Sequence, residues 1–202
     1  MTTTRPSLTF LKRMAYGTLA IAVFLPMVMP AYAAPAADPA YTAVDPFIGT
    51  GEGGHTYPGA TVPFGMVQLS PDTDHHSFHK GYKWAAGYRY EDDSILGFSH
   101  THFSGTGHSD LGDVLLMPIA GEVKLEPGNP VKPGSGYRSR FDHASEEAEP
   151  GYYAVTLSDY GTRVELTTTR RVGLHRYTFP QNTPAHVLLD LRSSIYDYPG
   201  KV

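Results

Sequence analysis

Apolar and polar positions alternate along much of the chain beyond residue 44, and this alternation predicts β-strands. It is clearest in Tyr153–Leu157, Val164–Thr168 and Val172–Leu174, where one row of side chains points inward and the other outward. Shorter apolar runs predict strands buried on both faces, at Phe64–Leu69, Ile95–Phe98, Val114–Ile119 and Val187–Leu191. Glycine or proline interrupts almost every ten residues, and only Ala144–Glu149 has helical composition. The pattern predicts an all-β fold, an antiparallel β-sandwich over residues 44–202 with under about one fifth helix.

The first 33 residues have the pattern of an export signal. A basic segment precedes an apolar run from Met14 to Met29, and Ala31-Tyr32-Ala33 matches a cleavage site. A transmembrane anchor is the alternative, but the run is short, contains Pro26 and lacks a basic stop. We expect cleavage after Ala33, a linker over 34–43 and a domain over 44–202, hence a periplasmic or extracellular location with no membrane contact after cleavage.

Composition excludes several classes of protein. The 202 residues carry a net charge of −4, and no basic patch of the kind that binds nucleic acid stands out. Without cysteine, the chain holds no disulfide, thiolate zinc site or iron–sulfur cluster. Hydrophobic residues make up 41% and charged residues 18%, which indicates a folded chain.

A glycine-rich loop at residues 49–55 contains the candidate residues Gly53, Gly54 and His55. A phosphate-binding loop would end in Gly-Lys-Ser/Thr before a helix, whereas Thr56-Tyr57-Pro58-Gly59 follows here. The glycines predict a tight loop or the close approach of another surface, and a purely structural role remains an alternative.

Seven of the ten histidines lie between His55 and His108. Because residues i and i+2 of a strand share a face, His100 and His102 are predicted to converge on one ligand. The spacings match no known metal motif, so hydrogen bonding or substrate contact is favoured over a metal. Ser99 suggests a serine nucleophile, but Gly97–Thr101 lacks the final glycine of the nucleophile elbow.

The single tryptophan, Trp84, lies among tyrosines and next to the acidic stretch 91–93. An aromatic platform beside carboxylates is typical of a sugar-binding site. Burial in the core of a sandwich is the alternative for a lone tryptophan.

Several long motifs resemble family 92 of the glycoside hydrolases. They are Val44–Gly51, His55–Asp72, Gly87-Tyr88, Ile95–Gly107, Asp110–Asp113, Pro150–Tyr153 and Arg171–Phe179. The resemblance implies a calcium-dependent exo-α-mannosidase that hydrolyses with inversion and consists of an N-terminal β-sandwich and a C-terminal (α/α)6 barrel. It also implies that the acid, the base and most Ca²⁺ ligands lie in the barrel. We therefore expect no catalytic residue and no metal ligand in this chain.

The resemblance makes Trp84 the candidate platform for the leaving sugar, with His100, His102 and the loop residues Gly53, Gly54 and His55 as further candidates for sugar contact. We expect the N-terminal domain of an exported enzyme that removes terminal α-linked mannose from glycans, inactive without its barrel. The alternative is a stand-alone carbohydrate-binding β-sandwich. Ser193–Val202 has no closing element, which suggests a piece of a longer protein. Several hundred further codons would favour the enzyme.

Overall fold

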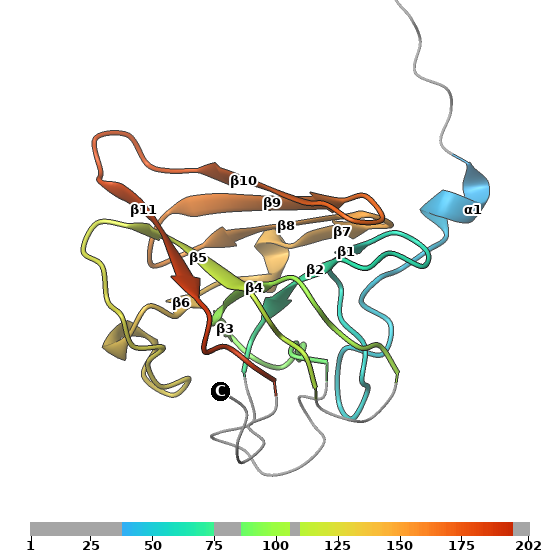
Figure 1. Ribbon diagram of the computed structural model, residues 1–202, viewed down its shortest axis with the longest axis horizontal. Coiled ribbons are helices and arrows are strands. Elements are labelled where there is room, and N and C mark those ends of the chain that lie inside the picture. The colour runs from blue at the N-terminus through green and yellow to red at the C-terminus, as the bar shows by residue number, and fades with distance from the viewer. Residues whose placement is uncertain (1–37, 75–85, 106–109, 196–202) are drawn as a thin grey trace, which may run out of the picture. The chain divides into compact units, whose positions relative to one another are not determined.

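Two antiparallel β-sheets lie face to face in the computed structural model, which describes residues 38–74, 86–105 and 110–195 (Figure 1). The larger sheet has the strand order β1 (Ala60–Thr61), β2 (Gln68–Asp72), β4 (Gly97–Ser99), β5 (Leu115–Ala120), β11 (Ala185–Asp190). The second has the order β10 (Gly173–Thr178), β9 (Thr162–Thr168), β8 (Tyr152–Leu157), β7 (Glu147–Glu149). A short pair joins β3 (Ser94–Ile95) to β6 (Ser139–Arg140). This architecture confirms the predicted antiparallel β-sandwich.

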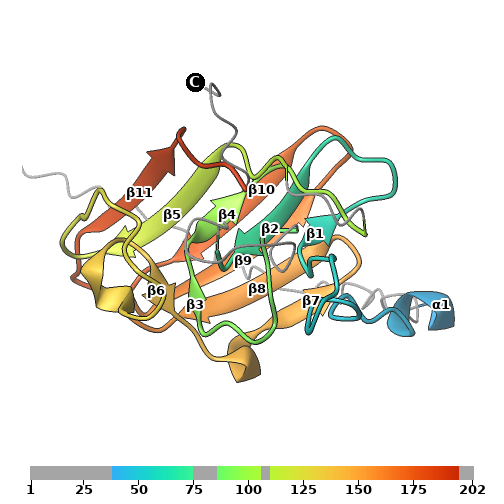
Figure 2. The same cartoon turned by 90° about the horizontal axis from the view of Figure 1, so that it is seen from below.

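The core fills the space between the two sheets. Leu69, Phe98 and Met117 of the larger sheet and Tyr153 and Leu166 of the second are at most 1% exposed. They lie on the inward rows of their strands, as the alternation predicts for a sheet with one buried face. Seen from below, the strands of the larger sheet overlie the strands β8 and β9 and run in a similar direction (Figure 2). The sandwich is therefore held by hydrophobic burial between the sheets.

Two apolar runs differ from the prediction of burial on both faces. Strand β11 pairs with β5 alone among the described strands, and Val187 and Leu189 are 51% and 50% exposed. Phe64 is fully exposed in a turn with φ of +58°, so the run Phe64–Leu69 contributes only its last residues to β2. Apolar residues in sequence cannot distinguish an edge strand or a turn from a central strand.

The segment Ala144–Glu149 is not helical. A 3₁₀ turn over His143–Ser145 is followed by β7, which pairs with β8. Pairing with a neighbouring strand therefore overrides the helical propensity of the alanines and glutamates. The predicted linker also contains a single helical turn, α1 (Pro39–Thr42), in which Asp38 accepts a hydrogen bond from the Ala40 amide.

Helix is otherwise limited in the described ranges to a second 3₁₀ turn at Pro133–Ser135, in agreement with the low helix content predicted. No helix in that part of the chain is long and apolar enough to cross a membrane. The predicted signal segment lies outside the described residues.

Candidate functional site

Three segments far apart in sequence meet around the glycine-rich loop. The Tyr90 amide donates to the Thr50 carbonyl at 3.0 Å, and the Glu52 amide donates to the Glu91 carboxylate at 2.6 Å. On the other side, the Gly105 amide donates to the His55 carbonyl at 2.5 Å. The loop therefore bridges the segment around Tyr90 and the segment that follows strand β4.

Close approach of backbone explains one of the two candidate glycines. A Cβ added to Gly54 would lie 1.7 Å from the carbonyl oxygen of Gly49, whereas one added to Gly53 would have no neighbour within 4 Å. Gly54 allows the loop to fold back on itself, so that the Thr56 amide reaches the same Gly49 carbonyl. The purely structural role that the sequence left open therefore applies to Gly54. Gly53 is exposed and stays a candidate for sugar contact.

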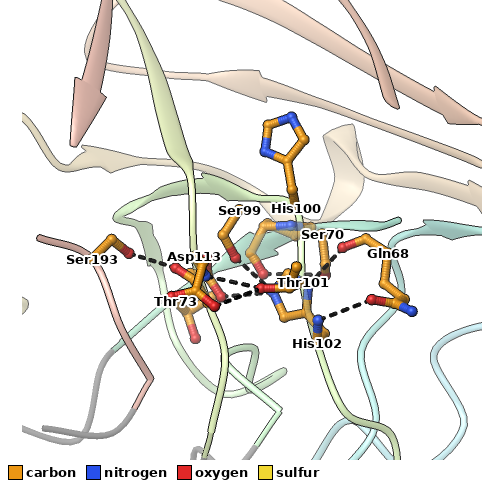
Figure 3. A network of polar contacts seen from close by, with 12 residues as sticks. Gln68, Ser70, Thr73, Ser99, His100, Thr101, His102, Asp113 and Ser193 are labelled. Carbon is orange, nitrogen blue, oxygen red and sulfur yellow. Dashed lines mark hydrogen bonds and ion pairs between the residues drawn. The ribbon is translucent and has the colours of Figure 1, made fainter. Parts of the chain in front are cut away.

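His102 lies beneath this loop, in a buried polar network (Figure 3). Its Nδ1 is 2.8 Å from the Gln68 carbonyl oxygen, and its Nε2 is 2.9 Å from Asp72 Oδ1. The ring is 3% exposed, and Tyr57 of the loop covers it with ring centroids 4.9 Å apart. Because a carbonyl only accepts, Nδ1 carries a proton and donates to Gln68. His102 and Asp72 form a buried hydrogen-bonded pair through Nε2.

Ser99 completes the network without forming a nucleophilic triad. Its hydroxyl is 3.0 Å from His102 Nε2, the same nitrogen that faces Asp72. In a triad the serine and the carboxylate contact different ring nitrogens. Ser99 is also fully buried, so the geometry speaks against a serine hydrolase, as the sequence predicts.

His100 points away from His102, contrary to the predicted convergence (Figure 3). Strand β4 ends at Ser99, so the alternation of a strand no longer applies to the two residues. The Nδ1 of His100 lies 2.6 Å from the Val114 carbonyl oxygen, and its Nε2 lies 3.2 Å from Nε2 of His175 on β10. The two histidines therefore belong to different environments, and no single ligand can reach both rings.

The residues on either side of the segment 75–85 are hydrogen-bonded to each other. The Thr73 amide donates to the Gly87 carbonyl at 2.8 Å, and the Arg89 amide donates to Thr73 Oγ1 at 3.0 Å. The guanidinium of Arg138, 1% exposed, donates to the Thr73 carbonyl at 2.7 Å. Trp84 lies outside the described residues, so its predicted role stays a prediction.

A pocket of about 540 Å³ opens on the outer side of the loop. Its aromatic side is the stack of Tyr90 on His143, with ring centroids 4.2 Å apart and planes 21° apart. Glu52 and Glu91 supply carboxylates, and Phe47 packs edge-on against Tyr90. Apolar ring faces beside a few polar groups are what a sugar-binding pocket requires.

Glu146 at the base of this pocket is held by three side chains. It accepts hydrogen bonds from the hydroxyls of Tyr88 at 3.0 Å and Tyr153 at 2.6 Å, and it pairs with His143 at 2.5 Å. Burial, together with the nearby Glu146 charge, raises the pKa of both tyrosines. The ion pair between Glu146 and His143 thereby fixes the His143 ring on which Tyr90 stacks. His143 and Glu146 are not among the site residues predicted from the sequence; the spacing His-x-x-Glu after Asp142 was the available signal.

The described residues do not fit a calcium site. In the ranges 38–74, 86–105 and 110–195, no group of three or more histidine, aspartate or glutamate side chains could hold a metal ion.

The fold and these loops define the chain as an antiparallel β-sandwich domain with a pocket lined by aromatic rings and carboxylates. Residues 43–200 match the model of the glycosyl hydrolase family 92 N-terminal domain, and the chain belongs to that family. A family GH92 α-mannosidase from Bacteroides thetaiotaomicron in complex with mannoimidazole is 47% identical over 77% of this chain, with a TM-score of 0.73. An inverting GH92 mannosidase from the same organism is 29% identical over 67% of the chain, with a TM-score of 0.54.

A curated relative, described as an uncharacterized secreted glycosidase of Arthroderma benhamiae, is 34% identical over 141 residues, which is 69% of this chain. The chain spans 17% of the length of that relative and 20% of the length of the mannoimidazole-bound mannosidase.

Proposed function

We propose that this chain is the N-terminal domain of an exported exo-α-mannosidase that removes terminal α-linked mannose with inversion. The observation that carries the proposal is the family match over residues 43–200, at 47% identity to a mannosidase of known structure. Inversion requires two carboxyl groups roughly 6.5–9.5 Å apart with a water molecule between them. We assign both groups, and the Ca²⁺ ligands, to the part of the enzyme outside this chain.

The role of this chain is to form one wall of the glycan-binding site. Tyr90 offers an exposed ring face, 45% exposed, beside the carboxylates of Glu52 and Glu91. The loop residues Gly53 and His55 and the tryptophan Trp84 are the further candidates for sugar contact that the sequence offers. Sugar rings stack their C–H faces on aromatic rings and accept or donate hydrogen bonds at their rim. His102 supports this wall from beneath, because its ring nitrogens are both used inside the protein.

Titration of the chain with α-mannobiose, followed by NMR, tests the binding role. We expect shifts confined to the loop 49–57, Trp84 and the Tyr90 pocket, reduced by Tyr90→Ala. They should be unchanged by Tyr152→Ala, because the Tyr152 side chain bonds Glu165 and lines a different pocket. Cellobiose serves as the control ligand. Equal shifts with both disaccharides, or shifts only at distant residues, would contradict the proposal.

Two further measurements separate the domain from a stand-alone binding module. The chain alone should not cleave an aryl α-mannoside, even with added calcium, because it lacks the acid and base. Turnover that disappears when one of its own carboxylates is replaced would contradict this. Sequencing the gene beyond Val202 addresses the second candidate, since a stop codon there would favour the binding module.

In the full-length enzyme, Trp84→Ala should lower kcat/KM for mannobiose by roughly 10–100-fold and affect an activated aryl mannoside less. The loss then falls on the binding energy of the leaving sugar. Equal losses on both substrates, with a large drop in stability, would assign Trp84 to the core.

A further inference from the structure

His100 and His175 approach each other from opposite sheets of the sandwich. His100 follows β4 in the larger sheet, and His175 lies on the inward row of β10 in the second. Their Nε2 atoms are 3.2 Å apart, and their ring centroids are 4.9 Å apart. Both rings are half-buried, so solvent reaches the edge of the pair.

The geometry points to a bis-imidazole site for a divalent transition-metal ion of the zinc or copper class, bound by the Nε2 atoms of His100 and His175. Two nitrogens about 2.05 Å from one zinc ion and 3.2 Å apart subtend about 103°, close to the tetrahedral angle. Rings aimed at such an ion would have centroids about 5.0 Å apart, against 4.9 Å observed. A linear N–H···N hydrogen bond would hold the centroids about 5.5 Å apart instead.

In both histidines the nitrogen that would not bind the metal, Nδ1, already has a hydrogen-bond partner. The Nδ1–H of His100 donates to the Val114 carbonyl, which leaves the Nε2 lone pair free to bind. The Nδ1 of His175 is 2.8 Å from the Tyr177 hydroxyl, which can accept from Nδ1–H when Nε2 binds a metal. A metal-bound histidine almost always has its second nitrogen fixed in this way.

The ring of His175 is neutral near pH 7 and needs to lose no proton to bind. Burial, and secondarily the nearby His100, lower the pKa of His175 to about 4. The remaining positions on the ion would be filled by water, because no third histidine or carboxylate joins the pair in the described ranges. Imidazole ligands select zinc and copper over calcium, which prefers oxygen. This site is therefore independent of the calcium that the family implies.

Zinc bound here would link the two sheets at the exit of β4. The site forms only in the folded chain, so the ion would stabilise the fold by mass action. This inference departs from the sequence-based expectation that the chain holds no metal ligand. It does not depend on the proposed mannosidase role.

Titration of the metal-free chain with zinc, followed by calorimetry, tests the site. We expect zinc binding that is at least about tenfold weaker in both His100→Gln and His175→Gln, and about tenfold weaker in Tyr177→Phe. The control His186→Gln, on exposed β11, should bind as the native chain does. Calcium should not compete.

A spectroscopic measurement on the unaltered chain keeps the test valid where a variant folds poorly. Copper(II) should give an electron paramagnetic resonance spectrum with coupling to two imidazole nitrogens, and zinc should raise the Tm. Binding of zinc with equal strength in the native chain and both histidine variants would overturn the inference, wherever the ion then lies. So would the absence of binding at about 1 mM zinc.

Discussion

His100 and His102 stand two residues apart, yet they lie in opposite environments. His102 is 3% exposed, with both ring nitrogens bonded to Gln68 and Asp72. His100 is half-buried and reaches across the sandwich to His175. The difference shows that a histidine's partners, and not its place in a motif, decide whether it supports a site or can bind a ligand. The comparison predicts a graded series of effects.

The largest effect is expected from breaking the buried pair of His102 and Asp72. Asp72→Ala removes the carboxylate that faces His102 Nε2 inside the core and should cost about 3–5 kcal/mol of unfolding free energy. Urea denaturation measures this loss.

The double variant Asp72→Asn/His102→Gln is the matched control. Because it replaces both partners of the contact with neutral amides, it should recover a large part of the loss, and the coupling energy of the cycle isolates the pair. A loss under about 1 kcal/mol for Asp72→Ala would place His102 in the same class as His100 and remove the contrast.

A smaller effect is expected in the loop that covers His102. Gly54→Ala places a Cβ against the Gly49 carbonyl and should cost about 1–3 kcal/mol through overpacking. Gly53→Ala is the control, because its Cβ would meet nothing within 4 Å. Thermal unfolding of both variants gives the difference. Equal stability of the two would mean that the loop is not held closed over His102.

On the other side of the comparison, His100→Gln should cost only about 1 kcal/mol in the presence of a chelator, the net value of one hydrogen bond. Solvent can replace the lost partner of the Val114 carbonyl at this half-buried position. Urea denaturation with and without zinc sharpens the test, because zinc should widen the gap between native and variant chains. A cost as large as that of Asp72→Ala would make His100 a core residue.

The fold was predictable because hydrophobic alternation is a local property. Tyr153–Leu157 and Val164–Thr168 became β8 and β9 within two residues of the expected bounds. The grouping of the glycine loop with His102 was also predictable in part, since both belong to long family motifs. The direction of His100 was not, because it depends on where β4 ends. The pair His100–His175 joins residues 75 positions apart, and no spacing in the sequence signals it. The Tyr90–His143 stack escaped prediction for the same reason.

The smallest effect is expected at a surface ion pair, which sets the scale for the buried pair. Arg140 Nε donates to Asp159 Oδ1 at 2.9 Å, but the Arg140 side chain is 64% exposed. The hydrogen bond from Arg140 is the main reason that the pKa of Asp159 lies below its ordinary value of 3.8. Its stabilisation is therefore fully present above pH 3.8 and is lost as the pH falls through the lowered pKa. Asp159→Asn should cost under about 1 kcal/mol at pH 7, and the native and variant chains should converge in stability once the pH falls below the lowered pKa of Asp159. Unfolding measured across this pH range checks both statements. A cost near that of Asp72→Ala would show that burial does not separate the two pairs, which is the difference on which the comparison of His102 with His100 depends.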